Sequence, residues 1–170
     1  VLFLDAGDVM TGSPISEYEY AGAKGGALFT MMNALGYDAY TIGNHDLDIS
    51  QENLRNLTAI AKFPIVSANV VVAQPGVPPE QSPPAFTPYV ILDRSFVDTQ
   101  GVRHPIKVGV IGFVPPQIML WDRDHLQGRV HALDIQETAK RLVPRMRAEG
   151  AQLVVAIPHS GFERGETPRF

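Results

Sequence analysis

Two polar runs follow apolar stretches that the sequence pattern predicts to be β-strands. Residues 7–12 (Gly-Asp-Val-Met-Thr-Gly) follow the apolar residues 1–4, and residues 43–46 (Gly-Asn-His-Asp) follow residues 39–42. Each run begins with a glycine and continues with side chains that can bind a metal ion or move a proton. Open α/β sheets build their sites beyond the carboxyl ends of their strands. The sequence therefore predicts an α/β fold with a polar site at one sheet edge.

Composition restricts the possible partners and cofactors. The 170 residues fit one domain with a substantial core, and 45% apolar and 19% charged residues are ordinary for a globular protein. A net charge of −4 argues against a nucleic-acid polymer as partner. The absence of cysteine excludes disulfides, thiolate ligands and cysteine nucleophiles. No run of about 18 apolar residues occurs, so the sequence predicts no membrane-spanning segment.

Three helices are predicted from apolar spacing and end signals. The first covers residues 26–35 and ends at Gly36, a natural C-cap. The second covers about 51–61 after Ser50, and the third runs from an Asp134 cap to about residue 148.

Apolar runs between these helices predict the strands. They are residues 1–5, 37–42, one strand within 64–72, a hairpin of 89–93 and 106–112 around a turn at 98–101, and 153–157. Residues 73–88 contain six prolines and are predicted to be a loop. This alternation predicts an α/β fold with a mixed sheet.

Four side chains at the predicted strand ends have alternative interpretations. Asp8 is either a turn residue or a carboxylate that bridges two cations. Asn44 and His45 are either turn and surface residues, or an amide oxygen and an imidazole that face a metal and a substrate. The pair of motifs favours the functional interpretation. His159, directly after the last predicted strand, is either a loop residue or a metal ligand, and its position favours the ligand.

Asp48 lies three residues after His45. It is either a carboxylate that fixes the tautomer of the imidazole, or a helix cap or solvated acid.

Other polar and aromatic residues receive weaker assignments. Asp5 is equally compatible with a structural and a functional role, and Trp121 is predicted to lie in the core or to anchor a loop. No chemical role is predicted for His104, His125 and His131. The arginines at 141, 145 and 147 are expected to form a solvated helix face.

With these motifs, the chain resembles the calcineurin-like metallophosphoesterases. Residues 7–8, 43–46 and His159 match metal-binding blocks of that family. Residues 109–119, with Trp121 and Asp122 after them, are similar to the more specific bacterial group of 2′,3′-cyclic-nucleotide 2′-phosphodiesterase/3′-nucleotidases, and the similarity covers essentially the whole chain. The resemblance implies an α/β metallophosphoesterase sandwich of mixed β-sheets flanked by helices.

The resemblance also implies a role for individual residues. Asp8 would bridge two divalent metal ions, and Asn44 and His159 would bind the second of them. His45 would stand near the leaving oxygen as acid or transition-state stabiliser, with Asp48 orienting it. The ligand types admit Mn, Zn, Fe or Co. No substrate-binding residue is predicted.

Two positions depart from the family pattern. The family usually has Glu where this chain has Asp46, a position expected to be structural. The cyclic-nucleotide group often has Asn where Asp48 stands, whereas 5′-nucleotidases have Asp, which weakens the choice between these two branches.

Residues 1–170 are expected to be part of one metallophosphoesterase domain. Residue 1 already lies in a predicted strand and residues 162–170 form a polar loop. The family's first and last metal blocks and its C-terminal nucleotide-binding domain would lie outside the chain, so the isolated chain is predicted to be inactive.

The implied activity of the whole protein is two-metal hydrolysis of nucleotides. The substrates would be 2′,3′-cyclic nucleotides, converted to 3′-nucleotides and then to nucleosides, in the periplasm or outside the cell. The alternatives are a 5′-nucleotidase or sugar-nucleotide hydrolase of the same fold, and a relative that binds ligand without turnover.

Overall fold

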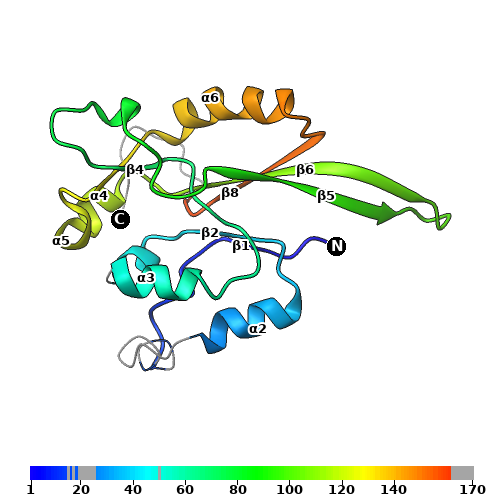
Figure 1. Cartoon of the computed structure of the whole chain (residues 1–170), viewed down its shortest axis with the longest axis horizontal. Coiled ribbons are helices and arrows are strands. Elements are labelled where there is room, and N and C mark those ends of the chain that lie inside the picture. Colours follow the sequence, from blue (N-terminus) through cyan, green and yellow to red (C-terminus); the bar gives the residue numbers. More distant parts are fainter. Residues whose placement is uncertain (15, 17, 19–25, 50, 162–170) are drawn as a thin grey trace.

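The structure is a computed structural model in which two β-sheets pack face to face between outer helices (Figure 1). Among the residues that it describes, no helix is long and apolar enough to cross a membrane. The described residues are 1–14, 16, 18, 26–49 and 51–161.

The first sheet is parallel and is covered by two helices. Its strands are β1 (Leu4–Asp5), β2 (Ala39–Thr41) and β3 (Ile65–Val66), in the order β1-β2-β3. Helices α2 (Ala27–Leu35) and α3 (Gln51–Thr58) lie below this sheet in Figure 1.

The predicted ends of these two helices can be compared with the structure. Gly36 has φ 74° and its N–H binds the carbonyl of Asn33, which confirms the predicted C-cap. Helix α3 ends at Thr58, three residues before the predicted boundary at residue 61. The predicted cap Ser50 lies outside the described residues.

The second sheet is mixed and is covered by one helix. Strand β6 (Arg103–Phe113) pairs antiparallel with β5 (Tyr89–Val97) and parallel with β8 (Leu153–Pro158). Helix α6 (Ile135–Ala148) covers the outer face (Figure 1). The Asp134 carboxylate accepts the N–H of residue 137 at 2.8 Å, which confirms the predicted N-cap.

The two sheets meet where β6 crosses β2 and β3. A Cβ on Gly112 would overlap with Thr41 Oγ1 and would lie 2.7 Å from the carbonyl oxygen of Val66. The Gly112 carbonyl also accepts the N–H of Ala68 at 2.8 Å. Only glycine permits this approach, because any side chain would push the sheets apart. The predicted α/β sandwich with mixed sheets and flanking helices is confirmed.

Among the described residues, three apolar clusters fill the spaces between the layers. Phe29 and Ile42 belong to the cluster between the first sheet and its helices. Ala39 and Val110 belong to the cluster between the sheets, and Met146 belongs to the cluster beneath α6. All five side chains are almost completely buried, so the layers are fixed relative to one another.

Residues 64–72 contain the predicted strand and also a second one that was not predicted. The segment contains β3 and a separate strand, β4 (Val70–Val72), which pairs antiparallel with β7 (Val130–Ala132). The chain leaves the first sheet at the buried Asn69, because the Asn69 side chain hydrogen-bonds to residues outside that sheet. Its amide donates to the carbonyls of Val114 and Leu133, and its oxygen accepts the N–H of Val114.

Several further elements differ from the prediction. Both hairpin strands are longer than predicted, and the proline-rich loop includes a short 3-10 turn, η2 (Pro79–Gln81). Helices α4 (Ile118–Trp121) and α5 (Arg123–Leu126) and strand β7 were not predicted. Trp121 is 43% exposed, so of its two predicted roles the place in the core is wrong, and the loop anchor stays a prediction.

Candidate active site

The loops that follow β1 and β2 lie in backbone contact. Gly7 has φ 97° and Asp8 has φ 66°, a left-handed conformation that Asp tolerates better than most residues. A Cβ on Gly7 would overlap with the backbone nitrogen of Gly43. A Cβ on Gly43 would overlap with Asp8 Oδ1 and lie 2.6 Å from the Asp8 nitrogen. The two glycines therefore allow the loops to touch.

Asp46 joins these two loops from inside. It is fully buried, and its carboxylate accepts the Tyr40 hydroxyl at 2.6 Å and the N–H groups of Gly43, Asp8 and Met10 at 2.8, 3.1 and 3.2 Å. Burial raises the pKa of Asp46, although these hydrogen bonds oppose the shift. Burial and the Asp46 charge also raise the pKa of Tyr40. The expected structural role of Asp46 is confirmed.

A third loop, after β8, brings His159 to the other two. The His159 N–H donates to the carbonyl of Phe113 at 2.8 Å, which continues the pairing of β8 with β6. Its Nε2 lies 3.0 Å from Asp8 Oδ2 and 3.2 Å from Asn44 Oδ1. The structure therefore brings together the three predicted metal ligands, from loops that are far apart in the sequence.

The donor atoms of these three residues fit a divalent cation. His159 Nδ1 lies 2.7 Å from the Ala6 carbonyl, which can only accept, so Nδ1 carries the hydrogen. In neutral histidine the Nε2 lone pair then faces the oxygens of Asp8 and Asn44. Three electron-pair donors directed at one another repel unless a metal ion or a proton lies between them. Carboxylate, amide oxygen and imidazole together suit a divalent transition metal, and the Ala6 contact orients the ring as metal-binding histidines require.

His45 and Asp48, the predicted catalytic pair, lie beside this cluster. His45 Nδ1 is 2.7 Å from Asp48 Oδ2, while the His45 side chain is 55% exposed. The hydrogen bond to Asp48 raises the pKa of His45, and partial burial opposes the shift. The His45 N–H donates to Asp8 Oδ1 at 2.9 Å, so the catalytic candidate is attached to a metal-ligand candidate.

Sequence reasoning missed Asp122, between α4 and α5. It is 9% exposed, and a donor atom of its side chain lies within 4.8 Å of those of His45 and Asp48. Burial and the nearby Asp48 raise the pKa of Asp122, and a hydrogen bond from Asn44 opposes the shift. The sequence signal was the pair Trp121-Asp122 in the group-specific stretch, but an aspartate before a short helix is more simply interpreted as a cap.

The remaining candidates lie away from this cluster or have local roles. Asp5 Oδ1 accepts the Gly7 N–H at 3.0 Å and so stabilises the turn after β1. His104 binds Asp98 at 2.7 Å in the hairpin. The arginines at 141, 145 and 147 are exposed on α6, as predicted.

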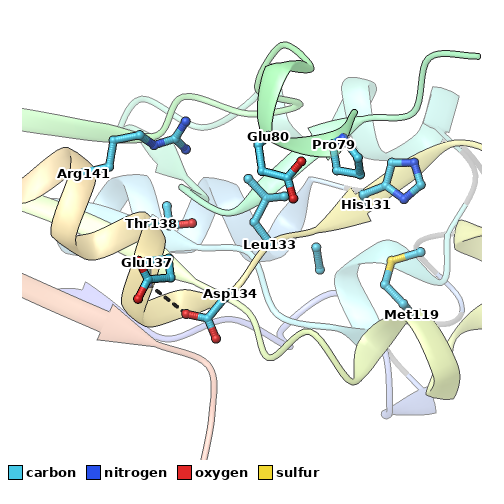
Figure 2. A pocket seen from close by; sticks show the side chains of 10 residues that line it. Pro79, Glu80, Met119, His131, Leu133, Asp134, Glu137, Thr138 and Arg141 are labelled. Atoms are coloured by element: carbon cyan, nitrogen blue, oxygen red, sulfur yellow. Dashed lines mark hydrogen bonds between the residues drawn. The ribbon is translucent and has the colours of Figure 1, made fainter. Parts of the chain in front are cut away.

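A separate pocket of about 480 Å³ lies between η2, β7 and the start of α6 (Figure 2). His131, Glu80 and Arg141 line it, but no residue of the predicted site does. Asp134, also at its wall, is engaged as the cap of α6 (Figure 2). The pocket is therefore distinct from the cluster around Asp8.

Known proteins are similar to this chain in both sequence and fold. The 2′,3′-cyclic-nucleotide 2′-phosphodiesterase/3′-nucleotidase of Haemophilus influenzae is 43% identical over 164 residues, which are 94% of this chain and 24% of that protein. The 5′-nucleotidase of Vibrio cholerae is 32% identical over 168 residues, 98% of this chain and 27% of that protein. The chain thus spans about a quarter of these curated relatives. No protein-family model matches it.

A solved structure agrees with these relatives. The crystal structure of the calcineurin-like phosphoesterase YfkN from Bacillus subtilis superposes with a TM-score of 0.85 at 39% identity, over 98% of this chain and 50% of that chain. The fold and the converging loops therefore define a calcineurin-like phosphoesterase, a class that implies divalent metal ions. Within that class, the chain belongs to the family that includes the 2′,3′-cyclic-nucleotide 2′-phosphodiesterase/3′-nucleotidases.

Proposed function

We propose that the protein containing this chain hydrolyses phosphoester bonds of small nucleotides with two divalent metal ions. Its substrates are 2′,3′-cyclic nucleotides, which it converts to 3′-nucleotides and then to nucleosides. The observation that carries the proposal is the meeting of Asp8, Asn44 and His159 beside the His45–Asp48 pair. The 43% identity to a phosphodiesterase/3′-nucleotidase supports the substrate class.

Asp8, Asn44 and His159 would hold metal in this proposal, with Asp8 as the bridging carboxylate. Divalent cations at such a site supply positive charge that stabilises the phosphoryl oxygens and activates the attacking water. The left-handed backbone at Asp8 and the Ala6 contact of His159 keep these ligands in place before metal arrives. Mn, Zn, Fe and Co all suit the ligand set.

His45 acts on the leaving group. Because its Nδ1 is hydrogen-bonded to Asp48, Nε2 is the ring nitrogen left to donate a proton to the departing sugar oxygen. The Asp48 contact fixes the tautomer and stabilises the protonated ring, which agrees with the raised pKa of His45.

We further propose that residues 1–170 are part of one metallophosphoesterase domain. The other metal blocks and a C-terminal nucleotide-binding domain lie elsewhere in the protein, which acts in the periplasm or outside the cell. The coverage of only 24% of the H. influenzae relative supports this arrangement. The isolated 170 residues are then expected to give no metal-dependent turnover, since part of the metal shell is missing.

The test is hydrolysis of 2′,3′-cyclic AMP, 3′-AMP and 5′-AMP by the full-length protein, with and without Mn²⁺. Mn²⁺-dependent release of adenosine from the first two substrates is the expected result. Turnover of 5′-AMP alone would favour the 5′-nucleotidase alternative, which the V. cholerae relative and the aspartate at position 48 both support. No turnover of any of the three would remove the proposal and favour a binding protein.

A further inference from the structure

Asp122 is a buried carboxylate without an ordinary structural role. It precedes α5, where aspartate commonly caps a helix, but its side chain makes no capping hydrogen bond. No lysine or arginine within the described residues forms an ion pair with it. Its Oδ2 is buried and has no hydrogen-bond donor in the described part of the chain. Burying a carboxylate is costly without compensation, so its contacts require an explanation.

The first of these contacts is with Asn44. The Asn44 side chain has two chemically different ends, an oxygen that can bind metal and an NH₂ group that cannot. Its Oδ1 lies 3.2 Å from His159 Nε2, on the side of Asp8. Its NH₂ group hydrogen-bonds to the Asp122 carboxylate. Only the NH₂ end can donate to a carboxylate, so this contact fixes the oxygen on the side of His159.

The second contact is with Asp48. One oxygen of Asp48, Oδ2, binds His45 Nδ1, while the other, Oδ1, is buried without a donor. An oxygen of the Asp122 carboxyl group lies within 4.8 Å of an oxygen of the Asp48 carboxyl group. Asp122 therefore limits the rotation of the side chain that orients His45.

We propose that Asp122 is a positioning residue that holds the Asn44 amide oxygen toward Asp8 and His159 and supports Asp48 behind His45. The part of this inference that concerns Asp48 and His45 rests on the proposed function. Its metal-binding part depends only on Asn44 as a ligand. Groups behind metal ligands commonly change metal affinity or activity by about 10- to 100-fold when they are removed.

The test compares three variants of the full-length protein. Asp122→Leu keeps a branched side chain of similar length and removes both polar contacts. Asp122→Asn keeps the shape, and its amide group can both accept a hydrogen bond from Asn44 and donate one to the neighbouring Asp48 carboxylate. Asp124→Leu, at an exposed position of α5, is the matched control. The readouts are Mn²⁺ affinity, measured by Mn²⁺ electron paramagnetic resonance without substrate, and kcat and KM for 2′,3′-cyclic AMP.

The expected result is a 10- to 100-fold loss of Mn²⁺ affinity in Asp122→Leu, with a lower kcat and little change in KM. Asp122→Asn should stay within about threefold of wild type, and the control should not differ from it. If Asp122→Leu does not fold, Asp122→Ala takes its place in the same comparison. Mn²⁺ affinity equal to that of the control, or equal losses in the Leu and Asn variants, would overturn the inference.

The two proposals fail in different ways. A wild-type protein that binds Mn²⁺ but hydrolyses no nucleotide would overturn the proposed function, while the affinities would still decide the role of Asp122 toward Asn44. A wild-type protein with normal turnover and an unaffected Asp122→Leu variant would overturn only the positioning role. Wild-type protein that neither binds Mn²⁺ nor hydrolyses nucleotides would overturn both.

Discussion

Removal of the Asp46 carboxylate should destabilise the contact between the loops that follow β1 and β2. Its Oδ2 accepts from the Tyr40 hydroxyl and from the N–H groups of Gly43 and Asp8, and its Oδ1 accepts from Met10. Asp46→Ala leaves three buried donors and the partly buried Asp8 N–H without partners. Each costs about 1 kcal/mol or more, so the variant should lose at least about 4 kcal/mol of local stability.

Asp46→Asn tests the hydrogen bonds themselves, because it keeps a polar side chain of the same shape but not all of the acceptors. With its oxygen at the Oδ2 position, Asn keeps three of the four hydrogen bonds. Its NH₂ group then faces the N–H of Met10, so one contact is lost at a cost of about 1–3 kcal/mol. The structure therefore predicts an ordered pair of effects, with Ala clearly worse than Asn.

Hydrogen–deuterium exchange with mass spectrometry measures this local effect in the full-length protein. Peptides that cover residues 7–12 and 40–48 should lose protection by roughly a thousandfold in Asp46→Ala, since every 1.4 kcal/mol is a factor of ten. In Asp46→Asn the loss should be roughly tenfold. Asp124→Ala, at an exposed position, serves as the control. Equal protection in the two Asp46 variants, or wild-type protection in Asp46→Ala, would refute the reasoning.

Two further predictions concern the metal ligands of the full-length protein. Gly43→Ala should displace Asp8 and empty the metal site, because its Cβ would lie 2.6 Å from the Asp8 nitrogen. Metal content by elemental analysis checks this. Gly76→Ala is the control that keeps its metal: its Cβ meets nothing within 4 Å, and the strain from its φ of 77° lies in a loop away from the site. Asp8→Ala should likewise lose metal, whereas His45→Ala should keep near-normal metal content but lose kcat by about 10²- to 10⁴-fold. Equal metal loss in Asp8→Ala and His45→Ala would contradict the role of His45.

Features that depend on neighbouring residues were predictable from the sequence. Gly36 and Asp134 end and begin their helices as predicted, because a cap is decided within one helical turn. The strands that lead to Asp8, Asn44 and His159 were also predictable, because buried strands have continuous apolar runs. The idea that their carboxyl ends meet follows from general sheet topology rather than from any local signal.

Features that depend on distant partners were not predictable. The break between β3 and β4 exists because Asn69 binds Val114 and Leu133, and a single sequence does not indicate such partners. Asp122 has the same difficulty, since its significance comes from contacts with Asn44 and Asp48 that only the folded chain creates. Local propensity assigns it to a turn, and tertiary structure decides its surroundings.

The three metal-ligand candidates share one property: each is held by a partner outside its own loop. Asp8 is fixed by the N–H of His45, His159 by the carbonyl of Ala6, and Asn44 by Asp122. A change in one loop therefore alters ligands carried by another, and the effects of such changes should not be additive. This arrangement also explains why two glycines occur where the loops touch. Because these glycines have no side chain, the two loops come close enough for such partners to form hydrogen bonds between them.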